Sequence, residues 1–403
     1  MEDLVFFATC PRGLESTLAT ELAQLRATSI EVVQGGVIFQ GGWQTCYQAN
    51  LESRIASRIL WRIAQQDYRS EADIYQIAFQ LPWHTWFSPK LTIRVKVSAI
   101  KCALRSLDFV TLKIKDAVCD KFRKAKNTRP DVDTANPAIR IHGFLDRQQF
   151  TLYLDTSGET LFKRNLRKSA GDAPIRENLA AGILALAGWK PNIPLFDPMC
   201  GSGTFLMEAA QISCRIAPGI NRHFAFEQFS LFDSPLWKQL REAALAQRLS
   251  SCTSQLIFGS DLSGYALDDA RENLISNQLA EIVQLKQANI LEVNPPHQPG
   301  GIIVMNPPYG VRMSEQQLLA DFYPKLGDRL KKKFSGWCVY ILTADSSLPK
   351  LIRLNPSRRI PLFNGALECR LLEYRMIEGS MRKGDSRSSN STPAELTTVS
   401  PNR

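Results

Sequence analysis

An amide, two prolines and an aromatic ring follow one another directly in the tetrapeptide Asn306-Pro307-Pro308-Tyr309. The apolar run Gly301–Met305 before it predicts a buried strand, and the tetrapeptide must lie beyond that strand because proline cannot donate to a sheet. Open α/β sheets bind ligands at the carboxyl ends of their strands. The amide and carbonyl oxygens could therefore hold a planar amino group there while the tyrosine stacks on its ring. Taken alone, the same residues could also be an ordinary end of a strand.

A second group of candidate residues lies upstream, in Asp197–Thr204. A buried strand and a helix are predicted on either side of it, at Ile193–Phe196 and Phe205–Ile212. Gly201 and Gly203 let the backbone approach a ligand closely, and the helix N-terminus favours an anionic group. The spacing matches neither the Walker pattern nor the full dinucleotide fingerprint. A carboxylate at Asp197 would repel phosphate, so a cationic or amino-bearing ligand fits better.

Polar residues also end the next two predicted strands. Asp261 ends the strand Gln255–Asp261, where an acidic residue characteristically accepts hydrogen bonds from ribose hydroxyls. Asn289 ends the strand Ile282–Asn289, where its amide could contact an adenine ring. The apolar stripe of Tyr265–Leu274 predicts a helix between these strands. The alternative for Asp261 is a helix N-cap or a turn aspartate.

In this order along the chain, these elements resemble the motifs of class I S-adenosylmethionine-dependent methyltransferases that act on exocyclic amines. Four further segments are similar to the THUMP-containing RNA guanine-N2 methyltransferases: Ala8–Glu15, Tyr153–Leu161, Ala173–Ala181 and Leu362–Cys369. The similarity extends to about Met381, and within the family it is greatest to members that act on 23S ribosomal RNA. No second catalytic domain follows, so we expect a form with this activity alone.

The resemblance implies an α/β fold in two parts. A Rossmann-like class I methyltransferase domain with a seven-stranded mixed sheet is expected over residues 161–380. It would follow an α+β region made of a ferredoxin-like segment (residues 1–60) and a THUMP RNA-binding domain (residues 61–160). Residues 381–403 are rich in serine, threonine, proline and charge, which predicts a disordered tail.

Residues 1–160 alternate between predicted strands and helices. Strands are expected at Leu4–Ala8, Val37–Phe39, Leu91–Val97, Ala138–Ile141 and Gln149–Asp155. Helices are expected at Leu14–Leu25 and Asp108–Lys124.

The resemblance also assigns roles to single residues. It implies that S-adenosylmethionine (SAM) is bound by Asp197, Met199, Cys200, Gly201, Gly203, Thr204, Asp261, Leu262, Asn289, Ile290 and Asn306. Catalysis would depend on Asn306, Pro307, Pro308 and Tyr309 holding and stacking a flipped guanine. A guanine amine is a poor nucleophile that needs its lone pair aimed at the sulfonium methyl more than it needs a base. We therefore expect neither an essential histidine nor a metal ion.

Two segments depart from the family pattern. Where the family often has Arg-Gly-Tyr-Arg, the chain has Arg164-Asn165-Leu166-Arg167, and Gln287-Ala288-Asn289 lacks the usual acidic residue at the third strand end. The insert Ile212–Ser254 separates the two site carboxylates, and we expect it to form a helical cover near the site. Its aromatic residues belong to the core more often than to a ligand site: Phe224, Phe226, Phe229, Phe232 and Trp237.

Charge favours an anionic partner. The 403 residues carry a formal net charge of +10, with a pI of about 9.2. The predicted helix Asp108–Lys124 and the residues after it concentrate basic side chains. Five of them are candidate RNA contacts: Lys113, Lys121, Arg123, Lys124 and Arg129. Asp116 and Asp120 are interleaved with these bases, so a solvated helix face is the alternative.

Nine scattered cysteines without a Cys-x-x-Cys pair favour free thiols in a reducing cytoplasm. No segment predicts a signal peptide or a membrane span, and nothing indicates the oligomeric state. Other functions remain open. DNA adenine-N6 and protein glutamine methyltransferases share the tetrapeptide, and transfer RNA guanine-N2 methyltransferases share the N-terminal region as well. From a different class, the chain could be a catalytically silent RNA-binding assembly factor.

Overall fold

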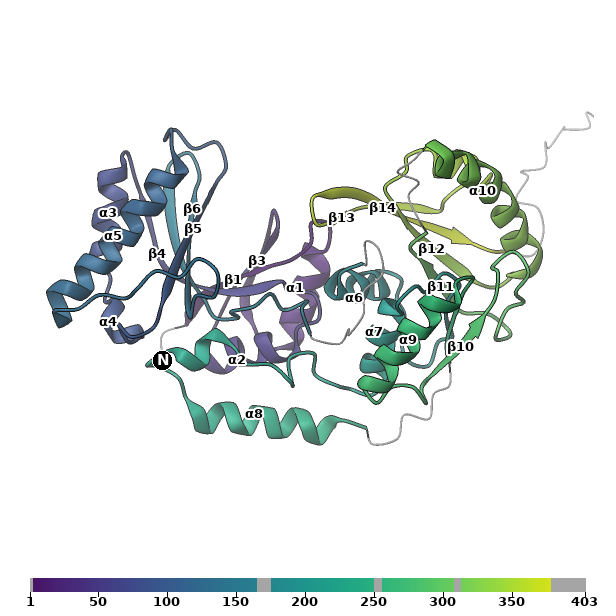
Figure 1. Ribbon diagram of the computed structural model, residues 1–403, viewed down its shortest axis with the longest axis horizontal. Coiled ribbons are helices and arrows are strands. Elements are labelled where there is room, and N and C mark those ends of the chain that lie inside the picture. Colours follow the sequence, from purple (N-terminus) through teal and green to yellow (C-terminus); the bar gives the residue numbers. More distant parts are fainter. Residues whose placement is uncertain (1–2, 165–174, 250–255, 308–312, 378–403) are drawn as a thin grey trace, which may run out of the picture.

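The computed structural model describes residues 3–164, 175–249, 256–307 and 313–377, except for the side chains of residues 313–318. The molecule is elongated and holds two separate seven-stranded sheets (Figure 1). One sheet is built from the N-terminal region and the other from the C-terminal region. This is the two-part α/β architecture that the sequence predicted.

The first sheet has the strand order β2-β3-β1-β4-β7-β6-β5. Its strands are β1 (Leu4–Thr9), β2 (Thr28–Val33), β3 (Gly36–Gly41), β4 (Arg58–Asp67), β5 (Ile93–Ala99), β6 (Ile139–Leu145) and β7 (Gln149–Asp155). The long strand β4 pairs with β1 near its start and with β7 along its length, so it joins the two expected N-terminal parts, residues 1–60 and 61–160, into one sheet. The sequence predicted five of these strands but missed β2 and β4. A register shift between Arg62 and Ala64 breaks the regular alternation in β4.

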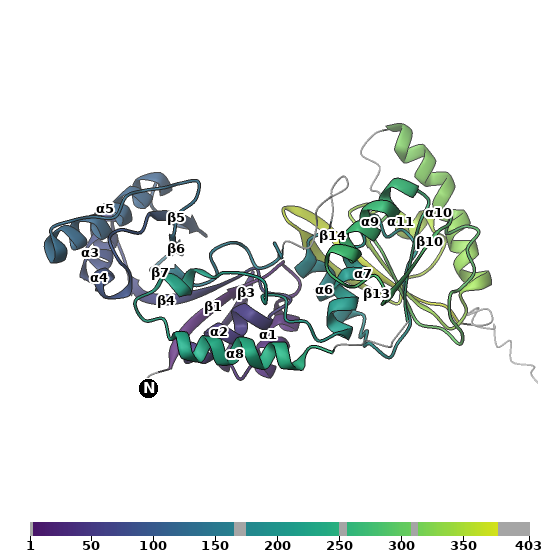
Figure 2. The same cartoon turned by 60° about the horizontal axis from the view of Figure 1, so that its bottom comes forward.

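The N-terminal helices are α1 (Glu15–Gln24), α2 (Trp43–Glu52), α3 (Glu71–Gln80), α4 (Trp83–Trp86) and α5 (Leu107–Lys126). The sequence predicted a helix at Asp108–Lys124, and in α5 the buried residues Val110, Ile114 and Phe122 lie on one face, as in an amphipathic helix. Ser106 caps this helix by accepting a hydrogen bond from the Phe109 N–H at 3.2 Å. Both α3 and α5 lie at the end of the molecule away from the second sheet (Figures 1 and 2).

The second sheet has the strand order β10-β9-β8-β11-β12-β14-β13. Its strands are β8 (Leu195–Asp197), β9 (Ile257–Asp261), β10 (Val283–Gln287), β11 (Ile302–Met305), β12 (Cys338–Thr343), β13 (Arg358–Asn364) and β14 (Leu367–Arg375). Strands β8 to β12 are parallel, whereas β14 runs antiparallel between β12 and β13. This confirms the predicted seven-stranded mixed sheet. The strand order reverses between β8 and β11, which makes a topological switch point there.

The helices around this sheet are α6 (Glu177–Leu186), α7 (Thr204–Ser213), α9 (Gly264–Ser276), α10 (Met313–Lys333) and α11 (Leu348–Leu351). Every residue of the short central strands β8 and β11 is buried, as expected for parallel strands covered on both faces. These strands therefore hold the carboxyl edge of the sheet rigidly. None of the helices in the described ranges is both long enough and apolar enough to cross a bilayer.

The insert after α7 forms the short helix η1 (Ala225–Gln228) and α8 (Ser234–Gln247). It packs on α2 of the N-terminal region, where Tyr47 stacks on Phe226 with ring centroids 4.4 Å apart (Figure 2). The expectation of a cover near the site is therefore wrong, because the aromatic residues of the insert complete a cluster around Tyr47. Four of the five are buried and Phe232 is partly buried, as the core interpretation predicted.

A buried ion network joins the two parts of the chain. Glu208 of α7 is fully buried and pairs with the Arg164 guanidinium, while Arg54 Nη1 lies 3.8 Å from its other oxygen. Arg164 also donates to the Arg54 carbonyl oxygen at 2.7 Å. Arg164 thus lies in the joint between the two parts, whereas the departures at Asn165–Arg167 fall outside the described residues.

Two sequence segments that resemble the family meet at the same joint. Arg12 from the first segment lies over the ring of Phe363 from the last one, with its guanidinium carbon 4.4 Å from the ring centroid. Between β1 and α1, Gly13 has a φ of +92°, and a Cβ there would lie 2.2 Å from the Pro361 carbonyl oxygen. Only glycine allows β13 to approach this closely.

We expect Glu208→Gln to lower the free energy of unfolding by about 3 kcal/mol, because it leaves buried guanidinium groups without a counter-charge. Chemical denaturation would measure the change. The matched control is Glu242→Gln, which removes an exposed pair with Lys238 (3.9 Å) and should cost less than about 1 kcal/mol. Equal effects of the two substitutions would mean that the network does not stabilise the joint.

Candidate active site

The predicted site residues follow strands that are neighbours in the second sheet. Asp197 ends β8, and Asp261 ends β9, where it is aligned with Gln287 of β10. Asn306 directly follows β11, which pairs with β8 on its other side. These four strands run parallel, so their carboxyl ends meet at one edge of the sheet. The structure brings Asp197, Asp261 and Asn306 to that edge.

The glycine loop between β8 and α7 is held by backbone hydrogen bonds. The Cys200 N–H donates to the Ser260 carbonyl oxygen of β9 at 3.0 Å, and the Gly203 N–H donates to the Cys200 carbonyl oxygen at 2.8 Å. Gly203 has a φ of +83°, and a Cβ there would lie 3.3 Å from the Cβ of Ala270. Glycine is needed at this position for both reasons. Thr204 is buried and begins α7.

Asp261 lies at the carboxyl edge of the sheet and also stabilises the glycine loop. Its Oδ2 accepts a hydrogen bond from the Gly201 N–H, and its Oδ1 accepts one from the Ser263 N–H, both at 2.9 Å. The helix N-cap is Ser263, whose hydroxyl accepts from the Ala266 N–H, so the N-cap alternative for Asp261 is wrong. The turn alternative for Asp261 accounts for one of its two hydrogen bonds, the one from the Ser263 N–H two residues further along the chain. Each carboxylate oxygen keeps a second lone pair for a hydroxyl donor.

The sequence analysis missed Asn273, which supports the same loop from α9. Asn273 is fully buried, and its Nδ2 donates to the Ser202 carbonyl oxygen at 3.2 Å. A signal was present, because Asn273 lies three residues after Ala270 on the apolar face of the helix. A polar residue on such a face needs a buried partner.

The ends of β9 and β10 form the outer part of the site. Gln287, from the segment that lacks the usual acidic residue, donates to the Leu262 carbonyl oxygen at 3.1 Å. This bond holds the Leu262 backbone while its side chain is 68% exposed, which leaves an apolar surface beside Asp261. Ile290 is buried, and Asn289 accepts from the Leu291 N–H at 3.0 Å. Such a surface could pack on a flat ring.

Asp197 gives the site its charge preference. It is buried, and burial together with the nearby charge of Asp261 raises its pKa well above the ordinary range, although the Met199 N–H donates to it at 3.1 Å. Two carboxylates in this setting favour a cationic group, whose charge would stabilise the ionised forms.

We expect Asp197→Asn to stabilise the ligand-free protein at neutral pH. Because the folded-state pKa of Asp197 is raised, the stability it contributes is present at low pH and is lost as the pH rises towards that pKa. The stabilising effect of Asn should therefore shrink as the pH falls towards about 4, the ordinary pKa of aspartate. Thermal unfolding of both proteins across this range tests the expectation, and a difference that does not depend on pH would contradict it.

Part of the predicted catalytic tetrapeptide lies in the described ranges. Asn306 is half-buried and Pro307 is buried directly after β11. Pro308 and Tyr309 lie outside the described residues. The described part of the chain holds no group of three or more histidine, cysteine or carboxylate side chains able to bind a metal ion.

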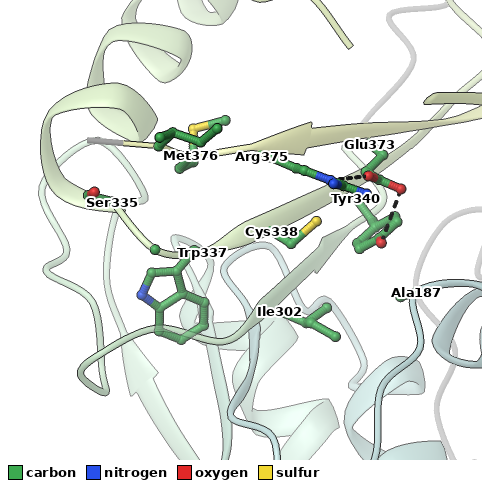
Figure 3. A pocket seen from close by; sticks show the side chains of 11 residues that line it. Ala187, Ile302, Ser335, Trp337, Cys338, Tyr340, Glu373, Arg375 and Met376 are labelled. Atoms are coloured by element: carbon green, nitrogen blue, oxygen red, sulfur yellow. Dashed lines mark hydrogen bonds and ion pairs between the residues drawn. The ribbon is translucent and has the colours of Figure 1, made fainter. Parts of the chain in front are cut away.

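A hollow of about 580 Å³ lies at the opposite edge of the sheet, where β11 and β12 begin (Figure 3). It is lined by Ile302, Cys338 and Glu373 among others. The buried Glu373 accepts hydrogen bonds from the Tyr340 hydroxyl at 3.3 Å and from Arg375 at 2.9 Å. Because this hollow is at the amino ends of the strands, it does not belong to the candidate active site.

The predicted RNA-binding residues on α5 and just after it fall into two groups. Lys121 donates to the Gln80 carbonyl oxygen at 3.3 Å, and Arg123 pairs with Asp120 at 2.6 Å. Lys113 lies over an aromatic ring of its own helix. These three side chains therefore have contacts within the protein.

The other two predicted residues, Lys124 and Arg129, are exposed and pair with no carboxylate in the ranges the structure describes. The Lys124 ammonium lies 5.7 Å from the ring centroid of Phe79 on α3. Helix α5, which carries Lys124 and is followed in the chain by Arg129, lies at the end of the molecule far from the second sheet (Figure 1). Lys124 and Arg129 are the better candidates for contacts with an anionic partner.

Comparisons with known proteins agree with this geometry. Residues 164–373 match the RMKL-like methyltransferase domain, residues 5–60 match the RlmL ferredoxin-like domain and residues 68–155 match the THUMP domain. A ribosomal RNA large subunit methyltransferase K/L of Aeromonas hydrophila is 39% identical over 388 residues, covering 92% of this chain and 54% of that protein. The chain thus spans about half the length of this relative.

Two further proteins are similar over most of their own length. A Synechocystis sp. protein named as an RNA methyltransferase is 36% identical over 370 residues, which cover 92% of this chain and 96% of that protein. A methyltransferase crystallised with S-adenosylhomocysteine (SAH) has a TM-score of 0.84 at 29% identity and covers 94% of this chain and 100% of its own.

The strand order and the glycine loop at the switch point define a class I methyltransferase domain. The chain belongs to the RMKL-like methyltransferase family.

Proposed function

We propose that the chain transfers a methyl group from SAM to the exocyclic N2 of a guanine in 23S ribosomal RNA. One observation carries the proposal: a carboxylate-bearing glycine loop and Asn306 meet at one sheet edge, in a chain that also contains a THUMP domain. The Aeromonas relative, named for the large ribosomal subunit, supports the RNA class. The SAH-bound neighbour supports the cofactor, and free cysteines fit the reducing cytoplasm.

The residues at the edge fit SAM. Asp197 is buried beside a second carboxylate and would accept the ammonium group of the methionine part. Asp261 would accept from the ribose hydroxyls, and the exposed Leu262 with Asn289 and Ile290 would hold the adenine ring. Bound there, SAM supplies an electrophilic methyl group on a positively charged sulfur.

Catalysis would consist mainly of positioning the target amine. The Asn306 side-chain oxygen and the Pro307 carbonyl oxygen would accept the two amine hydrogens, which aims the nitrogen lone pair at the methyl carbon. Flipping the guanine out of its stack costs a few kcal/mol, and stacking on Tyr309 would return about 1–3 kcal/mol. Methyl transfer leaves a proton on the amine, which the same acceptors can pass to water.

The proposal is tested by incubating the protein with methyl-labelled SAM and separate pools of 23S ribosomal RNA, transfer RNA and DNA. We expect label in 23S ribosomal RNA, recovered as N2-methylguanosine after nuclease digestion. Asn306→Ala should lower kcat by roughly 10²–10³, by analogy with the loss of one preorganised polar group. Calorimetry should find its SAM affinity unchanged.

The outcomes separate the alternatives. Label in transfer RNA alone would favour the transfer RNA methyltransferases, and label in DNA alone would remove the RNA assignment. RNA binding without SAM binding would indicate a silent assembly factor. Near-full activity of Asn306→Ala would remove Asn306 from the mechanism.

Substituting both Lys124 and Arg129 by glutamine should weaken RNA binding at low salt. For each phosphate that the protein no longer neutralises, the slope of log affinity against log salt concentration should become shallower by about 0.7–0.9. Lys238→Gln is the control, because Lys238 is exposed but lies on α8 in a different part of the molecule. If the double substitution leaves the salt slope at the control value, these bases form only a solvated helix face.

A further inference from the structure

A hollow of about 530 Å³ opens at the carboxyl end of β12. Leu319 and Ala320 of α10 line one side, and the loop Ala344–Ser347 that follows β12 lines the other. Its volume lies in the range of small-molecule sites, which is about 300–1,000 Å³. A single nucleobase fits well within this space.

Strand register places this loop at the same sheet edge as Asn306 and Pro307. Met305 of β11 is aligned with Ile341 of β12 in a parallel pair. Continuing that register sets Asn306 and Pro307 level with the last two residues of β12, so the chain enters Ala344–Ser347 at the same edge. The hollow therefore lies on the β12 side of Asn306, whereas the cofactor loop lies on the β8 side. A base bound in the hollow and SAM would approach Asn306 from opposite sides.

The half-buried Asp345 presents an acceptor at this place. Its Oδ1 accepts hydrogen bonds from the Ser347 N–H and the Ser347 hydroxyl, both at 2.7 Å. Its own N–H donates to the Thr343 hydroxyl at 3.0 Å, which fixes the backbone. No hydrogen bond reaches Oδ2 from any residue the structure describes. The carboxylate is thus held by one oxygen and can accept from a ligand with the other.

A buried hydroxyl lies near the same carboxylate. Tyr323 of α10 is fully buried, and its hydroxyl makes no hydrogen bond within the described ranges. Burial and the charge of Asp345 raise its pKa, so the group stays protonated at neutral pH. Tyr323 is not among the residues that line the hollow, so the group that meets a ligand there is the Asp345 carboxylate.

We propose that Asp345 is a specificity-determining residue that accepts a hydrogen bond from N1–H of the target guanine. The inference rests on the proposed function. Guanine presents N1–H and the N2 amine side by side, so Asp345 could hold N1 while Asn306 and Pro307 hold the amine. A base with a bare N1, such as adenine or 2,6-diaminopurine, would turn a lone pair towards the carboxylate and be repelled.

The test uses an RNA fragment in which the methylated guanine is replaced by 2,6-diaminopurine, which keeps the N2 amine but lacks N1–H. We expect the wild-type kcat/KM to be about 10–100 times higher for guanine than for diaminopurine, because diaminopurine loses a hydrogen bond to a charged group. Asp345→Asn keeps the bonds to Ser347 and can donate to a bare N1. It should bring the two values of kcat/KM within a few-fold of each other.

Glu368→Gln is the matched control. Glu368 lines the smaller hollow, of about 240 Å³, on the other side of Asp345, and the substitution removes the same charge. It should keep the wild-type preference, and SAM affinity should be equal in all three proteins.

The inference fails if the wild-type enzyme methylates guanine and diaminopurine equally well, and this result needs no variant. The inference also fails if Asp345→Asn leaves the preference for guanine over diaminopurine unchanged. It fails as well if Glu368→Gln reduces that preference as much as Asp345→Asn does. In these cases N2-methylation of guanine by the wild type still upholds the proposed function. If the wild type methylates no guanine at N2, the proposed function and the inference fail together.

Discussion

The buried carboxylate of Glu208 is the constraint on which the arrangement of the two parts depends. A fully buried charge is costly unless it is paired, so Arg164 and Arg54 must reach it. Glu208 lies on α7, the helix that begins at the glycine loop, whereas Arg54 belongs to the N-terminal region. The ion network therefore ties the orientation of the N-terminal region to the element that would hold the cofactor.

The two sides of the carboxyl edge of the second sheet differ in the charge of the ligand group that they favour. On the β8 and β9 side, Asp197 and Asp261 favour a cation, and the raised pKa of Asp197 shows that the protein alone stabilises its ionised form poorly. A ligand that brings a positive charge removes this penalty, so the site is less stable without its ligand than a neutral site would be. On the β12 side, Asp345 keeps one oxygen for a neutral donor. Asn306 lies between the two sides, where the proposed methyl transfer would take place.

The elongated shape sets a condition on the substrate. Helix α5, which carries the exposed Lys124, lies at one end of the molecule, and the second sheet with the proposed methyl-transfer site lies towards the other (Figure 1). A small ligand cannot contact both, whereas a folded RNA can. The continuous sheet through β4 and the packing of α8 on α2 hold the N-terminal region as one unit (Figure 2). A substrate bound at α5 would therefore be presented to the site at a fixed distance.

The amino-acid sequence by itself determined the elements whose signal is local. The strands β8 and β9, the glycine loop and Asn306 were predicted because apolar runs, glycines and prolines act on neighbouring residues. Only the tertiary structure decided what depends on distant partners. It placed the insert on Tyr47 instead of over the site and joined Arg164 to Glu208. It also brought Asp345 to the same sheet edge as Asn306 through the pairing of β11 with β12. Burial and strand register are properties of the whole chain, so no window of the sequence contains them.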